Sequence, residues 1–320
     1  MTLASTLQIR NDALFRAGEK TDGTSDLDAQ SLIYLNRAYR ALYMGGNEFD
    51  PSINEIWWWL KREDNIILDS VIDTGTVNVT NNSNSITFTT APTPVVDANV
   101  NTGWFLKIDE HPDVFKISNH TTSSVTAIID SVYTGKTNTA AKYKLMKLEY
   151  NLNSAAIKLI APMVGYQSGQ FKIFGMSLDR MESEYPLAQV QSGIPTKFAD
   201  VDEDTIRFNK YASPTQGELI RIDYDYLLKP SDLDDFSDPP LVPTQYRHIL
   251  SDMTLFFLMG DKGDTNAPAM SLQARSGIRA MAKENKDRWS KIGRMGSIAY
   301  RQRQVTNNFV RTQTLGLRIG

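Results

Sequence analysis

Apolar residues recur at three- and four-residue intervals near both ends of the chain, which is the spacing of one face of an α-helix. Leu3, Leu7, Leu14 and Ala17 follow this spacing, and Gly18 comes directly after them. The same spacing predicts helices over 3–18, 26–44, 243–259 and 268–291. Because a short turn joins the first two, we expect an antiparallel helical hairpin over 1–65.

The middle of the chain alternates apolar and polar residues with a period of two, as half-buried strands do. Between 66 and 150 the chain is rich in Thr, Val, Asn and Ser, and turn residues separate the alternating segments. The predicted strands cover 77–80, 85–90, 104–109, 114–118, 125–130 and 143–150. Short strands at this spacing favour a small β-barrel or sandwich.

The chain then returns to helical spacing, and after that to alternation. Helices are predicted over 154–165 and 177–185, inside a helical segment 151–193. Strands over 197–200, 205–209 and 218–226 predict a β-hairpin sheet at 194–230, and the last two helices lie in 231–292. The expected fold class is therefore α+β, with a helical bundle core, an inserted β module at 66–150, a β-hairpin sheet and an extended tail over 293–320.

Three of the five tryptophans are consecutive, at Trp57, Trp58 and Trp59. Adjacent residues point in different directions, so one small core does not accept all three indoles easily. We expect one to face inward and at least one to face a neighbouring subunit, together with Lys61 and Arg62. The alternative is that all three pack in the core at the junction, since Trp is highly buried on average.

Charge is unevenly distributed along the chain. Residues 271–320 hold eleven Lys and Arg against two acidic residues, a net charge of +9, while residues 1–270 carry −12. On the helix predicted for 268–291, Arg275, Arg279, Lys283 and Lys286 fall within ~80° of one another at about 100° per residue. This ridge favours docking onto an acidic surface or a phosphate backbone. A solvated helix face is the alternative.

The last thirty residues are basic and also carry regularly placed apolar side chains. A merely disordered tail would be poorer in apolar residues, so burial by a partner is expected. The proposed docking residues of this tail are Tyr300, Arg301, Arg303, Phe309, Arg311, Leu315, Leu317 and Ile319. Nucleic-acid binding is a secondary possibility, because aromatic residues are sparse in the tail.

The sequence offers little catalytic chemistry. There is no cysteine, and the histidines His111, His120 and His248 are scattered. Phosphate-binding glycine motifs, HExxH and GxSxG are absent. The acidic loop 232–238 lacks the order of a calcium-binding loop. We therefore expect no catalytic residues, no metal, no cofactor and no enzyme. The N-terminus does not resemble a signal peptide, and no apolar run is long enough to cross a membrane.

Several segments together resemble the head–tail adaptor proteins of tailed bacteriophages, also called connector or head-completion proteins. The first is a helix pair ending in IWWWLKRED before NIILDS. The second is a β insertion that closes with the YTG turn at 133–135 and exits through YKLMKLEYNL. The third runs from SGIPTKFADVDEDTIRFNKYASP through ELIRIDYDYLLKP to PPLVPTQYRHILSDMTLFFLMGDKGD.

This resemblance implies a structural virion protein. Members of the family form a ring, typically a dodecamer, between portal and tail around the DNA channel. The implied partners are other copies of the chain, the portal, a tail or nozzle protein, and DNA that passes without sequence-specific binding. No membrane is involved, and assembly takes place in the cytoplasm of the host bacterium. The basic helix and the tail would contact the portal.

Two other hypotheses remain open from the sequence. The β module at 66–150 could bind a glycan or a host surface, with Trp104 as its platform. A hydrolase with a carboxylate site from Asp223, Asp225, Asp232 and Asp235 is the third possibility.

Overall fold

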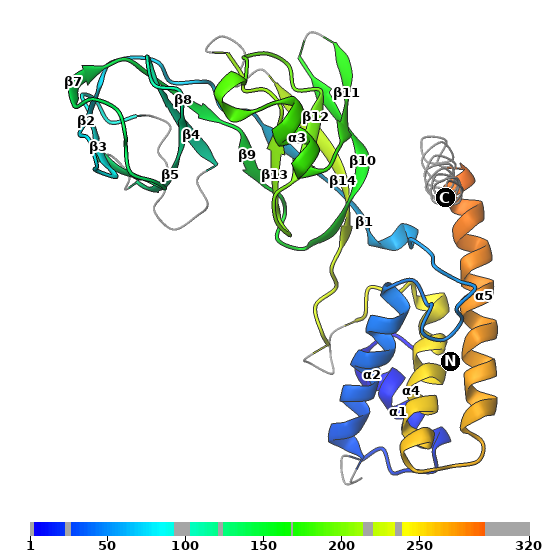
Figure 1. The fold of residues 1–320 in the computed structure, drawn as a ribbon. Coiled ribbons are helices and arrows are strands. Elements are labelled where there is room, and N and C mark those ends of the chain that lie inside the picture. The colour runs from blue at the N-terminus through cyan, green and yellow to red at the C-terminus, as the bar shows by residue number, and fades with distance from the viewer. Residues whose placement is uncertain are drawn as a thin grey trace, which may run out of the picture. The chain divides into compact units, whose positions relative to one another are not determined.

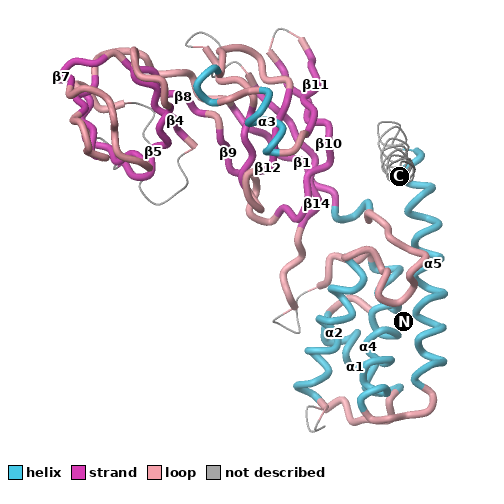
Figure 2. The backbone as a smooth tube through the Cα atoms, viewed as in Figure 1, coloured by secondary structure: helices cyan, strands magenta, loops and turns pink. Residues whose placement is uncertain are grey.

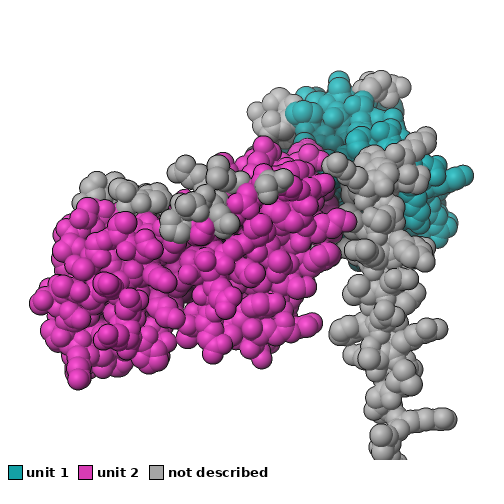
Figure 3. Space-filling view, turned by 90° about the horizontal axis from the view of Figure 1, so that it is seen from above, with its two compact units in different colours: residues 1–61, 229–320 teal, residues 62–228 magenta. Residues whose placement is uncertain are grey.

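The computed structural model describes residues 3–22, 27–92, 103–120, 124–167, 169–213, 220–233 and 239–291. The chain divides into two compact units (Figure 3). We call residues 1–61 and 229–320 the helical unit, and residues 62–228 the β unit.

The described part of the helical unit is built from α-helices around a central one (Figures 1 and 2). Helices α1, α2 and α5 each pack against α4. In one apolar cluster, Ala13 and Leu14 of α1 meet Leu255 and Leu258 of α4. The helices are α1 (Thr6–Arg16), α2 (Asp28–Tyr43), α4 (Arg247–Asp261) and α5 (Ala267–Lys291), with 3-10 turns η1 (Trp58–Leu60) and η4 (Thr244–Tyr246).

Local sequence explains where these helices begin and end. The Ser5 hydroxyl accepts a hydrogen bond from the Gln8 backbone N–H at 3.3 Å and caps α1. Helix α2 ends before Gly45 and Gly46, whose φ values of +107° and +77° suit glycine. These helices match the ranges predicted from apolar spacing to within four residues at each end.

The β unit contains two seven-stranded sheets in its described residues. Sheet I has the order β1-β14-β10-β11-β12-β13-β9, and sheet II has the order β7-β2-β3-β6-β5-β4-β8. The strands of sheet I are β1 (Lys61–Ile67), β9 (Glu149–Asn151), β10 (Ala156–Tyr166), β11 (Gln170–Gly175), β12 (Lys197–Asp200), β13 (Thr205–Phe208) and β14 (Arg221–Leu228). Those of sheet II are β2 (Val77–Val79), β3 (Ser85–Phe88), β4 (Trp104–Ile108), β5 (Val114–His120), β6 (Thr126–Ile129), β7 (Asn138–Ala141) and β8 (Tyr143–Lys147).

Each sheet encloses its own apolar core. Strands of sheet II contribute alternate residues such as Val77, Val79, Ile86 and Phe88 to one cluster. A second cluster fills sheet I. Helix α3 (Leu178–Glu184) packs against β12, and the 3-10 turn η2 (Leu187–Gln189) follows it. All strand pairs with a described register are antiparallel except β11 with β12, which is parallel.

The expected fold class, a helical bundle core carrying an inserted small β module and a separate β-hairpin sheet, is wrong. The described chain is mostly β, with two curled sheets and five α-helices, and no helical bundle core is evident. The β-hairpin residues 194–230 do not stand alone. They pair with β1, β9, β10 and β11 into sheet I, through strand contacts that local sequence does not reveal.

The helix predicted for 154–165 is a second error, because these residues form β10. Ala156, Ile157 and Ile160 fit a helical spacing, but Pro162 and Gly165 are poor helix residues that argued against it. Pro162 lies where the register between β10 and β14 shifts, between Ile160 and Val164. A proline lacks the N–H for a sheet ladder and is tolerated at such an irregularity.

Candidate docking surface

The tryptophan segment divides into two buried indoles and one half-buried indole. Trp57 is 0% exposed, and its indole N–H donates to the Leu42 carbonyl at 2.5 Å. Trp59 is 5% exposed. Trp58, between them, is only half-buried. The interpretation in which all three are core therefore fails at Trp58, while contact with a neighbouring subunit stays a prediction.

Asn285 of α5 holds this segment in place. Its side chain is buried, and its Oδ1 accepts the Trp58 backbone N–H at 3.0 Å. Its Nδ2 donates to the Glu55 carboxylate and to the Ile56 carbonyl, each at 3.0 Å. Because a buried amide without partners costs free energy, these three hydrogen bonds fix the position of the segment on α5. The partial exposure of Trp58 is thus a defined feature of the surface.

Arg288 lies over the ring of Trp58. Its guanidinium carbon is 4.3 Å from the ring centroid, and Nη2 is 2.7 Å from the Glu284 carboxylate. Glu284 also accepts hydrogen bonds from Tyr246 and Gln245. The arrangement joins α5, η4 and the tryptophan segment at one surface, with both charge and aromatic character.

The basic ridge of α5 is partly neutralised within the chain. Arg279 pairs with Asp50 at 2.6 Å, and Lys286 pairs with Glu55 at 3.2 Å. Both acidic partners come from the segment that precedes the tryptophans. The ridge is therefore less available to an external anion than its sequence spacing indicated.

Asp50 is held as a carboxylate. Its Oδ1 accepts hydrogen bonds from the Ser52 hydroxyl at 2.6 Å and from the Ser52 backbone N–H at 3.0 Å. The Ser52 hydroxyl first, and Arg279 next, lower the pKa of Asp50 to about 2. Asp50 remains charged at neutral pH and keeps its attraction for Arg279.

The other two ridge cations are Arg275, which is half-buried, and Lys283, which is exposed. Within the described residues, neither of them forms an ion pair. Lys61 and Arg62 are both half-buried where the helical unit passes into the β unit. The proposed tail residues Tyr300, Arg301, Arg303, Phe309, Arg311, Leu315, Leu317 and Ile319 lie outside the described residues.

Exposed apolar side chains are the feature that sequence reasoning missed. Ile33 and Met44 of the α2 region are 65% and 68% exposed, and Phe15 of α1 and Leu272 of α5 are 75% and 65% exposed. Ile33 and Met44 are eleven residues apart and share one side of α2, at about 100° per residue. The sequence does indicate that Ile33 is exposed, because Ile33 lies off the apolar face of the predicted helix. That face is formed by Leu32, Leu35, Tyr39 and Leu42.

We divide these side chains into two groups by the helices that carry them. Figure 1 shows α2 and α5 on opposite sides of α4 within the helical unit. Arg16, next to Phe15, approaches the Met270 sulfur at 3.9 Å, so the end of α1 adjoins the start of α5. We call Ile33 and Met44 the α2 flank, and Phe15 and Leu272 the α1/α5 flank.

The next residues are those considered for glycan binding and for a carboxylate active site. Trp104 is 2% exposed, so it offers no platform for a glycan. Asp223 pairs with Arg221 in the β unit, and Asp232 pairs with Arg40 in the helical unit. Asp225 lies on β14, and Asp235 is outside the described residues. No group of three or more His, Asp or Glu residues suited to a metal ion occurs in the described chain.

Comparisons with known proteins assign no family to this chain. No protein-family model matches it, and no curated protein matches it as a relative. None of the described helices has the length and apolar character needed to cross a membrane.

Proposed function

We propose that this protein is a structural virion protein, a head-to-tail adaptor that forms a ring between the portal and the tail of a bacteriophage, around the DNA channel. The observation that carries the proposal is the presence of two separate apolar flanks on the helical unit. The family resemblance of the sequence supports it as an additional argument.

The two flanks suit a head-to-tail contact between copies. Large exposed apolar side chains mark interaction sites when several occur together. A ring is built from heterologous contacts, in which one surface of a subunit meets a different surface of the next. The α2 flank and the α5 part of the α1/α5 flank are two such surfaces, since α2 and α5 lie on opposite sides of α4 (Figure 1) and each packs against it.

Charged residues on these flanks favour one orientation of the contact between copies. Arg37 and Arg40 lie between Ile33 and Met44 along α2, and they pair with Glu48 at 3.0 Å and with Asp232. The α1/α5 flank continues along α5 toward the exposed Lys283. Polar groups around an apolar centre favour one docking register over others.

In this proposal the C-terminal segment 293–320 binds the portal. It carries five Lys and Arg residues, no acidic residue and regularly placed apolar residues. These suit a partner that combines an acidic surface with an apolar groove or an open sheet edge. The contact is separate from the contacts between copies, so the two can be removed independently.

A mixing experiment tests the head-to-tail arrangement. One variant carries Ile33→Glu with Met44→Glu, and the other carries Phe15→Glu with Leu272→Glu. Each variant alone should remain monomeric, because each has lost one surface of the contact. An equimolar mixture should form dimers and no rings, because one intact junction remains. Native mass spectrometry distinguishes monomers, dimers and rings.

The matched control is Val132→Glu with Ile157→Glu in the β unit, where the native side chains are 50% and 48% exposed. This control should assemble like the unsubstituted chain. Assembly of either flank variant like the unsubstituted chain would contradict the proposed contact. Removal of residues 293–320 should abolish binding to purified portal without changing self-assembly.

A further inference from the structure

The two sheets of the β unit are connected by two short crossings of the chain. Residues 68–76 lead from β1 of sheet I to β2 of sheet II, and Leu148 alone separates β8 of sheet II from β9 of sheet I. Sheet II is thus inserted into sheet I through neighbouring connections. Such a connection could act as a hinge unless other contacts fix it.

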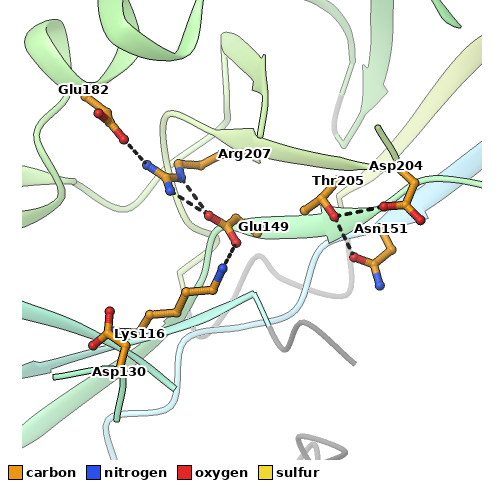
Figure 4. A network of polar contacts seen from close by, with 8 residues as sticks. All are labelled: Lys116, Asp130, Glu149, Asn151, Glu182, Asp204, Thr205 and Arg207. Carbon is orange, nitrogen blue, oxygen red and sulfur yellow. Dashed lines mark hydrogen bonds and ion pairs between the residues drawn. The ribbon is translucent and has the colours of Figure 1, made fainter. Parts of the chain in front are cut away.

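Glu149 lies at the second crossing, and its side chain is fully buried. One carboxylate oxygen accepts a hydrogen bond from Lys116 Nζ at 2.7 Å, and Lys116 belongs to β5 of sheet II. The other accepts from Arg207 Nε at 3.0 Å and Nη2 at 2.7 Å, and Arg207 belongs to β13 of sheet I. Figure 4 shows the carboxylate between the two cations. A single buried anion therefore binds one cation from each sheet.

The surroundings of the two cations complete this arrangement. Arg207 Nη1 donates to Glu182 of α3 at 3.2 Å. Lys116 and Arg207 also lie 5.9 and 5.5 Å from the ring centroid of Phe105 on β4. The side chain of Glu149 has no access to water, so loss of its charge would leave two cations without their shared partner.

The backbone at the same crossing is equally constrained. The Gly103 carbonyl accepts the backbone N–H groups of Leu148 and Glu149 at 3.1 and 3.2 Å. Gly103 has a φ of +62°, and a Cβ there would overlap the Glu149 carbonyl. Only glycine allows this close approach. An apolar cluster that includes Val71, Met146 and Leu148 fills the space between the sheets.

We propose that Glu149, Lys116 and Arg207 form a lock that holds sheets I and II in one fixed orientation, so that the β unit moves as a single rigid arm. Apolar contacts alone tolerate small sliding motions, whereas a buried charge bound from both sides accepts few arrangements. The inference does not depend on the proposed function.

Distance measurement by electron paramagnetic resonance tests the lock. The chain has no native cysteine, so Thr87→Cys on β3 and Lys172→Cys on β11 place one spin label on each sheet, at exposed positions. With Glu149, Lys116 and Arg207 unsubstituted, the doubly labelled chain should give one narrow distribution of distances between the two spin labels. Glu149→Gln should broaden it or add a second distance, because a neutral amide does not hold both cations.

Two further variants make the result decisive. Glu182→Gln is the control, since Glu182 is 57% exposed and contacts only Arg207 within this network, so the distribution should stay narrow. Lys116→Met removes only the sheet II cation and leaves the Arg207–Glu149 pair intact, so it should also broaden the distribution. It decides the question if Glu149→Gln does not fold. Narrow, unshifted distributions in the folded Glu149→Gln and Lys116→Met variants would overturn the proposal.

Discussion

The helical unit and the β unit differ in how they place their large apolar side chains. In the described residues, the helical unit leaves Phe15, Ile33, Met44 and Leu272 more than 60% exposed. Among the described residues of the β unit, the most exposed large apolar side chain is Ile67, at 57%. Both units nevertheless contain well-buried cores.

The difference follows from architecture. Each curled sheet encloses a core, so alternate residues of its strands turn inward. Three helices around α4 bury only their inner faces, and their outer faces are open to a partner. The β unit instead concentrates its unusual chemistry inside, at the buried Glu149. We interpret the helical unit as the part built for assembly and the β unit as a rigid arm.

Among the alanine variants, the largest expected effect comes from removing a buried indole. Trp57→Ala should lower the free energy of unfolding of the helical unit by ~3–5 kcal/mol, the range for large aromatic residues in cores. Trp58→Ala should cost only about 1 kcal/mol, mainly from the lost contact with Arg288. Denaturant titration followed by circular dichroism at a helix wavelength measures both. Equal losses would show that the half-buried indole is as structural as the buried one.

A smaller loss is expected at the residue that fixes the tryptophan segment. Asn285→Ala should cost about 1–3 kcal/mol, because it removes the hydrogen bonds from the Asn285 side chain to the Trp58 N–H and to the Ile56 carbonyl. The control is Asn11→Ala, whose half-buried side chain accepts hydrogen bonds from its neighbour Arg10. The same denaturant titration compares them, and an Asn285 variant as stable as the control would remove the argument for a fixed Trp58.

Acidification should weaken the link between Asp50 and α5. The folded-state pKa of Asp50 is about 2, below its ordinary value of 3.8. A lowered folded-state pKa stabilises the fold above the ordinary value, and this contribution is lost as the pH falls through the folded-state value. The melting temperature of the helical unit should therefore drop between about pH 4 and pH 2. Asp50→Asn should flatten this part of the profile, and an unchanged slope would contradict the assignment.

The smallest effect on folding is expected at the α2 flank. Ile33→Glu with Met44→Glu should change the stability of the monomer by only about 0.5 kcal/mol per substitution, as is usual on surfaces. In contrast, Ile222→Glu should prevent folding of the β unit, because Ile222 is 0% exposed in sheet I. Thermal melts of the two variants compare the effect of a charge on an exposed apolar surface with its effect in an enclosed core.

Sequence periodicity predicted most individual elements because it is a local property. Leu32, Leu35, Tyr39 and Leu42 mark the buried side of α2, and alternation marked most strands of sheet II. The helix predicted for 154–165 failed because β10 is specified by its partners β11 and β14. The joining of β9 to β13 depends on pairs such as Tyr150 with Ile206, which are distant in sequence.

The candidate surface was predictable only in part. Spacing placed the basic residues of α5, and the run of tryptophans marked a junction. The neutralisation of Arg279 by Asp50 joins residues 229 positions apart, which no local pattern reveals. The exposure of Phe15 is likewise invisible in sequence, because it depends on whether another element covers α1.

The most direct test of the central claim is sedimentation velocity of the unsubstituted chain over a concentration series, beside the variant with Ile33→Glu and Met44→Glu. The unsubstituted chain should form larger species as its concentration rises, and the folded variant should stay monomeric over the same range. A chain that remains monomeric at every concentration, or a variant that assembles equally well, would contradict the assignment of the helical unit as an assembly surface.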